Sequence, residues 1–204
     1  MATIKLSHGN SKIFKALIWN LPAGKTCPGA TELCKKGCYA KASEIRFPNV
    51  VPQSRKRNLD TSRTKTFVED MVAAINCSSY EKFRIHESGD FYSQKYLDDW
   101  TKIIKQCPDT IFWAYTKSYK LDFSKILKLK NVVMRYSVDA STEHLPKQKM
   151  AKAHTSATYN KSFVCPSTLA KGHSVRCMKD CSFCIESKNG ITFRPHGGKK
   201  KVFE

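Results

Sequence analysis

Apolar residues in the middle of the chain alternate between the spacing of strands and the spacing of helices. Residues 82–87, 111–116 and 132–138 are short stretches rich in branched and aromatic residues, which is typical of strands. After the first stretch, Ser93 is a typical helix N-cap, and apolar residues follow it at helical intervals. A shorter helix is expected over 122–129. This order predicts parallel strands joined by helices.

The amino-terminal part adds one more expected strand over residues 11–19, followed by turn residues. Residues 30–43 are compatible with a helix. Residues 46–60 contain two prolines and a basic run, which favours an exposed loop. A second helix is expected to begin at Thr61 or Ser62. Its apolar face is expected to hold Phe67, Met71 and Ile75.

Several polar groups stand where the expected strands end. In parallel α/β folds, functional groups gather at the carboxyl ends of the strands, in both open doubly wound sheets and partial barrels. After residue 145 the pattern fades, so we expect a domain over 1–145 and a cysteine-rich, loop-rich segment over 146–204 packed on it. The strand-end groups are the loop around Cys27, Ser88-Gly89-Asp90, Thr116-Lys117-Ser118, and Ser137 with Asp139.

The chain is strongly basic, with 36 Lys and Arg residues against 17 Asp and Glu and a net charge of +19. Such a charge attracts polyanions and makes nucleic acid a candidate partner, although basic residues also simply solvate a surface. The tail Lys199–Lys201 adds to the charge. With no bilayer-length apolar run and no apolar secretory signal in the sequence, we expect a cytoplasmic protein without membrane contact. The sequence leaves the oligomeric state open.

Nine cysteines are many for an intracellular chain, and seven of them fall into two groups. Disulfides are disfavoured inside cells, so clustered cysteines there indicate metal binding or redox chemistry. Four thiolates can hold zinc or a [4Fe–4S] cluster, whereas three thiolates leave one iron of a cluster open. The sequence therefore leaves open whether these cysteines hold one metal centre or two. The first group is Cys27, Cys34 and Cys38, and the second is Cys165, Cys177, Cys181 and Cys184.

His86, in the expected strand over 82–87, and Asp90, just after its end, are candidates for catalysis. If the strand alternates throughout, Arg84, His86 and Ser88 share one face, which can point toward a site. The alternative for His86 is a hydrogen-bonded structural histidine. Asp90 follows a glycine at a strand end, which favours a functional role. Arg55, Arg57 and Arg63 are expected to be solvated, and Cys77 and Cys107 to be ordinary cysteines.

The order of these motifs resembles a known family. A strand, a three-cysteine loop ending in Cys38-Tyr39-Ala40, and a strand ending in Ser88-Gly89-Asp90 precede strands near Tyr115 and Ser137. Over residues 12–184 this resembles bacteriophage proteins with a Cys-Tyr-Ala motif, the gene product eighty-eight domain family. These in turn look like relatives of radical S-adenosylmethionine (SAM) enzymes.

The resemblance implies a partial parallel (β/α) barrel whose first strand is followed by a three-cysteine [4Fe–4S] cluster. It implies that SAM binds the open iron and yields a 5′-deoxyadenosyl radical, with Ser88, Gly89 and Asp90 near the SAM amino group and Ser137 near its ribose or carboxylate. The usual spacing Cys-x3-Cys-x2-Cys occurs only in the second group, whereas the first group reads Cys-x6-Cys-x3-Cys. The second group then forms an auxiliary cluster with Cys165; the reverse assignment and a single shared cluster are the alternatives.

Together these observations predict an iron–sulfur protein of radical-SAM type with an α/β fold. The alternative is a non-catalytic iron–sulfur or zinc protein that binds nucleic acid or carries electrons.

Overall fold

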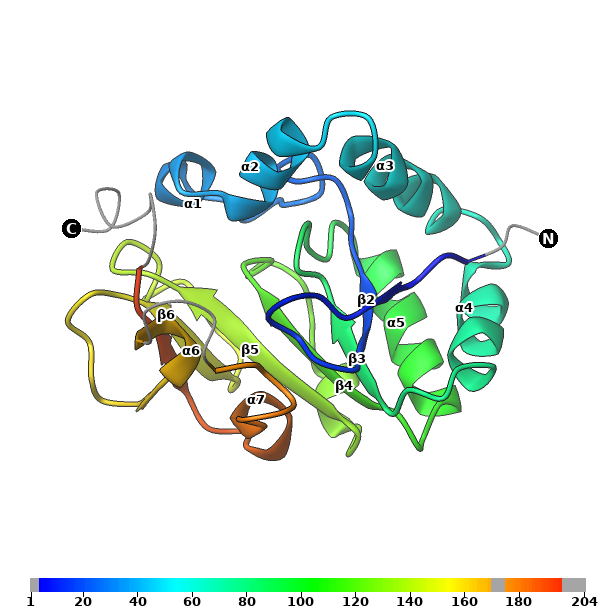
Figure 1. Ribbon diagram of the computed structural model, residues 1–204. Coiled ribbons are helices and arrows are strands. Elements are labelled where there is room, and N and C mark those ends of the chain that lie inside the picture. The colour runs from blue at the N-terminus through cyan, green and yellow to red at the C-terminus, as the bar shows by residue number, and fades with distance from the viewer. Residues whose placement is uncertain (1–3, 170–174, 196–204) are drawn as a thin grey trace.

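The computed structural model describes residues 4–169 and 175–195, and its strands form one eight-stranded sheet (Figure 1). The strand order is β1-β2-β3-β4-β5-β6-β8-β7, and every neighbouring pair except β1 with β2 is parallel. The tail at 199–201 lies outside the described residues. The strands are β1 (Ser7–His8), β2 (Leu17–Trp19), β3 (Lys82–Ile85), β4 (Ile111–Thr116), β5 (Val132–Val138), β6 (Ala151–Thr155), β7 (Phe163–Val164) and β8 (Ile191–Phe193).

From β2 to β6 each strand lies beside its neighbour in the sequence. Right-handed crossovers in such a singly wound sheet place the connecting helices on one face. Figure 1 shows α4 (Phe67–Asn76) and α5 (Gln94–Gln106) on that face. The expected α/β class with parallel strands is confirmed, and the sheet is open rather than closed into a barrel, with β1 and β7 at its edges.

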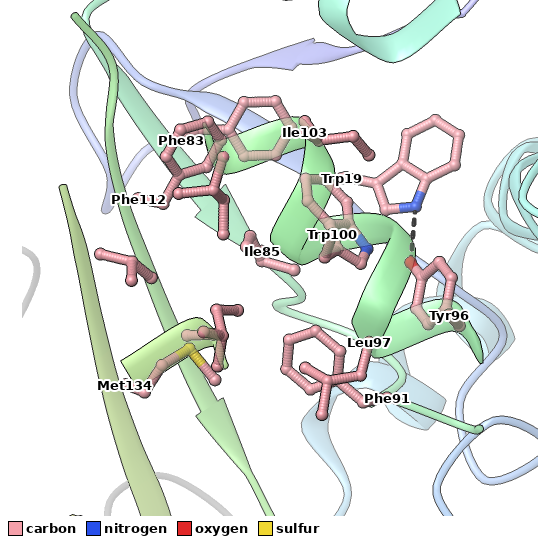
Figure 2. Close-up of a cluster of buried hydrophobic side chains, with 14 of the residues drawn as sticks. Trp19, Phe83, Ile85, Phe91, Tyr96, Leu97, Trp100, Ile103, Phe112 and Met134 are labelled. Atoms are coloured by element: carbon pink, nitrogen blue, oxygen red, sulfur yellow. Dashed lines mark hydrogen bonds between the residues drawn. The ribbon is translucent and has the colours of Figure 1, made fainter. Parts of the chain in front are cut away.

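The core under α4 and α5 is aromatic. Tyr96 and Trp100 of α5 pack against Phe67 of α4. Trp100 also packs against Phe83 of β3 (Figure 2). The indole Nε1 of Trp19 donates a hydrogen bond of 3.1 Å to the Tyr96 hydroxyl, which satisfies a buried donor. Ser93 caps α5 as predicted, since its side chain accepts from the Tyr96 backbone N–H.

The other face of the sheet is covered by the second cysteine group and α7 (Phe183–Glu186). Because side chains alternate along a strand, every second residue of the parallel strands points to this face. Met178 and Ile185 of the cysteine-rich segment pack there. The sheet residues on this face are Ile18, Arg84, Trp113, Tyr115, Val133 and Arg135.

The segment 46–60 differs most from the sequence prediction, because it forms helix α3 (Val51–Thr61) instead of an exposed loop. Pro52 lies in the first turn of this helix, where a missing backbone N–H costs nothing. Thr61 therefore ends a helix rather than beginning one, and α4 starts at Phe67. Arg55 is only 8% exposed and forms an ion pair of 2.8 Å with Glu44, so it is not solvated as expected.

The remaining differences are smaller. β4 and β5 have the predicted bounds, whereas β2 is shorter than predicted because Lys15 has a positive φ of 44°. The segment 30–43 splits into α1 (Glu32–Lys36) and α2 (Tyr39–Arg46). The expected helix at 122–129 is a single 3-10 turn, η1 (Ile126–Lys128). The carboxyl-terminal segment adds the strands β6, β8 and β7 to the same sheet, and it also contains the short helix α6 (Pro166–Leu169).

Candidate functional site

The first cysteine group lies in the connection after β2, which runs through α1 and α2 beyond the carboxyl ends of the strands (Figure 1). Thr31 caps α1 by accepting from the Cys34 backbone N–H at 3.1 Å, and Cys38 is the N-cap residue of α2. Arg55 of α3 donates to the carbonyl of Ala40 and to Glu44 of α2. A network of short helices therefore holds this loop.

Two glycines let the loop approach the strand ends closely. A Cβ on Gly29 would lie 1.7 Å from the carbonyl oxygen of Lys117, which follows β4. Gly89 follows β3 with φ +83°, and a Cβ there would lie 2.6 Å from Leu21 and from Thr26. Only glycine fits such positions. The cysteine loop is thus packed directly onto the ends of β3 and β4.

The three thiols of this loop lie close enough to influence one another. Burial raises the pKa of Cys27 to about 12, and the neighbouring Asp90, Cys34 and Cys38 add to that increase. Burial also raises the pKa of Cys34, with Lys117 opposing the increase. The structure therefore brings Cys27, Cys34 and Cys38 together, beside Asp90. In the absence of a metal, Cys27 and Cys34 therefore keep their protons, which metal binding would release.

Asp90 is buried at the centre of the strand-end site, with 6% of its surface exposed. Its carboxylate accepts from the Thr116 hydroxyl at 2.6 Å, the Lys117 backbone N–H at 2.8 Å and the Phe91 backbone N–H at 2.8 Å. Burial raises the pKa of Asp90 to about 6, although these hydrogen bonds favour the charged form. Asp90 thus joins the ends of β3 and β4.

A second charged pair lies beside it, at the ends of β4 and β5. The Lys117 ammonium donates to Asp139 at 2.9 Å and to the carbonyl of Ser137 at 3.0 Å. Burial acts to raise the pKa of Asp139, but hydrogen bonds from Ser141 and Lys117 outweigh it and hold the pKa below its ordinary value. The polar groups expected at four strand ends therefore meet at one edge of the sheet.

Ser88 and Gly89 serve the backbone of this edge. The Ser88 hydroxyl donates to the carbonyl of Leu21 at 2.7 Å, and its backbone N–H donates to the Asn20 side chain at 2.9 Å. These bonds tie the end of β2 to the end of β3. Ser137 is partly exposed at the end of β5.

His86 does not share the face of Arg84, so that expectation is wrong. His86 has a positive φ of 62°, which ends the alternation of β3. Its ring packs among Phe91, Tyr96 and Trp100 on the helix side, with Nε2 2.9 Å from the Tyr96 hydroxyl. Burial, with the charge of Arg84, lowers the pKa of His86 to about 3. Its place in the structure is that of a neutral core histidine.

The second cysteine group is gathered by a tight turn and by strand pairing. The backbone of Cys177 forms isolated β-bridges with that of Ile13 and with that of Cys181. Met178 has a φ of 69° in the turn between the two cysteines. Burial raises the pKa of Cys177 to about 11, and Cys184, Cys165 and Cys181 add to the increase. All four cysteines of this group therefore come together, although they span 20 positions of the sequence.

Sheet residues that the sequence did not single out support this second group. The Tyr115 hydroxyl donates to the Sγ of Cys184 at 2.9 Å. Arg135 is fully buried and donates to the backbone carbonyls of Asn189 at 2.8 Å and Cys184 at 3.0 Å, and to that of Ser187. In the sequence, the only sign that Tyr115 and Arg135 face the second cysteine group is their place in the alternating pattern of β4 and β5.

Two observations bear on metal binding. Within residues 4–169 and 175–195, no group of three or more Cys, His, Asp or Glu side chains is arranged to hold a metal ion as the side chains stand. The chemistry of the gathered donors nevertheless fits soft metals, because one group supplies three neighbouring thiols and the other four. Cys107 is buried in the helix-side core and Cys77 is exposed, away from both groups.

Comparison with known proteins identifies the family. The family model described as Gene product 88 matches residues 2–200. The chain belongs to the Gene product 88 family. The Gene 88 proteins of Mycobacterium phages L5 and D29 are each 33% identical over 144 residues, which cover 64% of this chain and 60% of each relative. No solved structure matches the chain significantly. No helix among the described residues is long and apolar enough to cross a membrane.

Proposed function

We propose that this Gene product 88 protein is an iron–sulfur protein whose first group, Cys27, Cys34 and Cys38, holds a [4Fe–4S] cluster with one open iron. The observation that carries the proposal is the gathering of three thiols at the carboxyl end of the first parallel strand. Three thiolates from one short loop leave one iron without a protein ligand. If bound there, such a cluster would supply an electron to SAM at the open iron, which is the chemistry of radical-SAM enzymes.

The residues around the first group suit the binding of a small polar cofactor. The singly wound parallel sheet places polar groups from β2 to β5 at one edge, as in partial barrels. In this proposal Asp90 accepts from the amino group of SAM, and its burial beside Cys27 and Cys34 keeps it within reach of the cluster. Ser88 and Gly89 hold the backbone of that edge, and Ser137 is available to a ribose or carboxylate.

The second group, Cys165, Cys177, Cys181 and Cys184, is proposed to hold a separate, fully ligated centre. Four neighbouring thiols complete a metal centre without an external ligand, so its metal is a second [4Fe–4S] cluster or structural zinc. The first group lies in the loop after β2 and the second packs on the sheet face, which favours two centres over one shared cluster. If SAM chemistry is absent, the same centres support a non-catalytic metal protein, and its charge of +19 favours nucleic acid as partner.

The test is anaerobic purification of the full chain followed by measurement of iron, sulfide and zinc, with absorption spectra before and after SAM. About four iron and four sulfide in a SAM-responsive cluster are expected from the first group. Joint substitution of Cys27, Cys34 and Cys38 by Ala should remove that iron and the SAM response. The matched control is joint substitution of Cys77 and Cys107, which should leave both unchanged. Iron content and a SAM response that the triple substitution leaves at the wild-type level would refute the assignment.

A further inference from the structure

Arg84 stands out among the buried charged residues. It lies on β3, on the sheet face opposite α4 and α5, and 8% of its surface is exposed. Its Nε and one terminal nitrogen, Nη1, are fully buried and have no hydrogen-bond partner. In the described part of the chain, no acidic side chain lies within ion-pair distance of it. A buried guanidinium in this state is costly to the fold.

The other two buried arginines show what this fold does with such a charge. Arg135 donates to three backbone carbonyls, and Arg55 pairs with Glu44 and donates to a backbone carbonyl and a serine. Both are structural residues whose donors are used within the protein. Arg84 has no equivalent set of acceptors, and its buried Nε and Nη1 donors are unpaired within the protein.

Aromatic rings orient the Arg84 guanidinium. Its central carbon lies 4.3 Å from the ring centroid of Tyr115 and 5.9 Å from that of Trp113. Contact with a ring face offsets part of the cost of burial but does not satisfy the N–H donors. A planar guanidinium held in this way keeps its N–H edge for bidentate recognition of an oxyanion.

The position of Arg84 connects it to both cysteine groups. Tyr115, against which it packs, donates to the Sγ of Cys184 in the second group. The hydroxyl of Tyr39, which follows Cys38 of the first group, donates to the backbone carbonyl of Glu87, three residues after Arg84. A molecule bound to Arg84 would therefore lie on the sheet face between the two groups, next to the strand-end site.

We infer that Arg84 is the anchor of a binding site for the oxyanion of a small ligand, a phosphate or a carboxylate, on this face of the sheet. Tyr115 and Trp113 hold the guanidinium in place, and its Nε and Nη1 donate to the bound oxygens. The inference rests on side-chain contacts alone and does not require that either cysteine group holds iron. It adds a ligand-binding residue to the sheet face beside the second cysteine group, where the proposed function names only metal ligands.

The test follows the thermal unfolding midpoint of the full chain with increasing inorganic phosphate, L-methionine or L-methioninamide at constant ionic strength. We expect a saturable rise with at least one oxyanion in the wild type. A response to phosphate indicates a phosphate-bearing ligand. A response to methionine but not to methioninamide, which lacks the carboxylate, indicates a carboxylate ligand. Loss of charged hydrogen bonds in Arg84→Met should weaken binding at least roughly tenfold.

The matched control is Arg63→Met, which removes the same charge from an exposed arginine that lies over the Tyr92 ring. It should keep the wild-type response. Without ligand, Arg84→Met should melt no lower than the wild type, because an unpaired buried charge is removed. If that variant does not fold, Arg84→Lys, which keeps the charge but not the planar fork, should bind more weakly than the wild type. No saturable rise with any probe, or a rise that survives at Arg84→Met or is undiminished at Arg84→Lys, would overturn the inference.

Iron and sulfide content measured on the same samples separates the two ideas. Arg84→Met should retain the iron of the wild type while it loses the oxyanion response. Failure of the cluster proposal would appear as missing iron in the wild type itself, with the oxyanion response intact.

Discussion

Gly29 offers the sharpest test of how the first cysteine group is built. In Gly29→Ala the new Cβ would lie 1.7 Å from the Lys117 carbonyl oxygen, whereas real Cβ contacts essentially never fall below 3.0 Å. The loop must therefore move by about 1.3 Å, several times the roughly 0.2 Å tolerance of metal–ligand distances. We expect loss of the iron bound by the first group, and a stability loss of about 1–3 kcal/mol as in other overpacked sites.

The assay combines iron and sulfide analysis of anaerobically purified protein with urea denaturation followed by circular dichroism. Gly24→Ala is the control, because Gly24 also precedes a cysteine of the loop but a Cβ there meets nothing within 4 Å. Its φ of +75° predicts only a backbone strain of about 1–2 kcal/mol. Wild-type iron content and stability in Gly29→Ala would refute the reasoning, as would an equal iron loss in Gly24→Ala.

Two further predictions concern buried groups outside the first group. Because the pKa of His86 is about 3 in the folded protein and near 6.5 when unfolded, the unfolded state binds its proton first as the pH falls below 6.5. The wild type should therefore lose about 2 kcal/mol more stability than His86→Gln between pH 7 and pH 5 in urea denaturation, and equal losses would contradict this. Arg135→Met leaves three backbone carbonyls unpaired and should lower the free energy of unfolding by at least about 2 kcal/mol. A change below about 0.5 kcal/mol would show that Arg135 does not hold the second cysteine group.

Local patterns in the sequence were sufficient for the middle of the fold. The apolar stretches at β4 and β5 and the Ser93 cap of α5 predicted their elements correctly, because burial on both faces and capping leave clear local signals. The clustering of Cys27, Cys34 and Cys38, and the family itself, also followed from the sequence. Parallel strands then required that polar strand-end groups such as Asp90 meet at one edge.

Other features depend on contacts between distant segments, which no local pattern records. Helix α3 forms in a proline-containing segment because Arg55 contacts Glu44 and the Ala40 carbonyl on α2. His86 turns into the helix-side core because a single positive φ ends the strand there.

For the carboxyl-terminal cysteines and the sheet face beside them, part of the arrangement was predictable from the sequence and part was decided by the tertiary structure. The spacing of Cys177, Cys181 and Cys184 in the sequence indicated a metal-binding type of turn, and Cys165 was expected to complete it. Only the tertiary structure shows that α7 and this group cover the face of β4 and β5. The charge of Arg84 was visible in the sequence. Its burial against Tyr115 without a partner for two of its nitrogens was decided by the packing of neighbouring strands, because a side chain's acceptors come from segments far away in the chain.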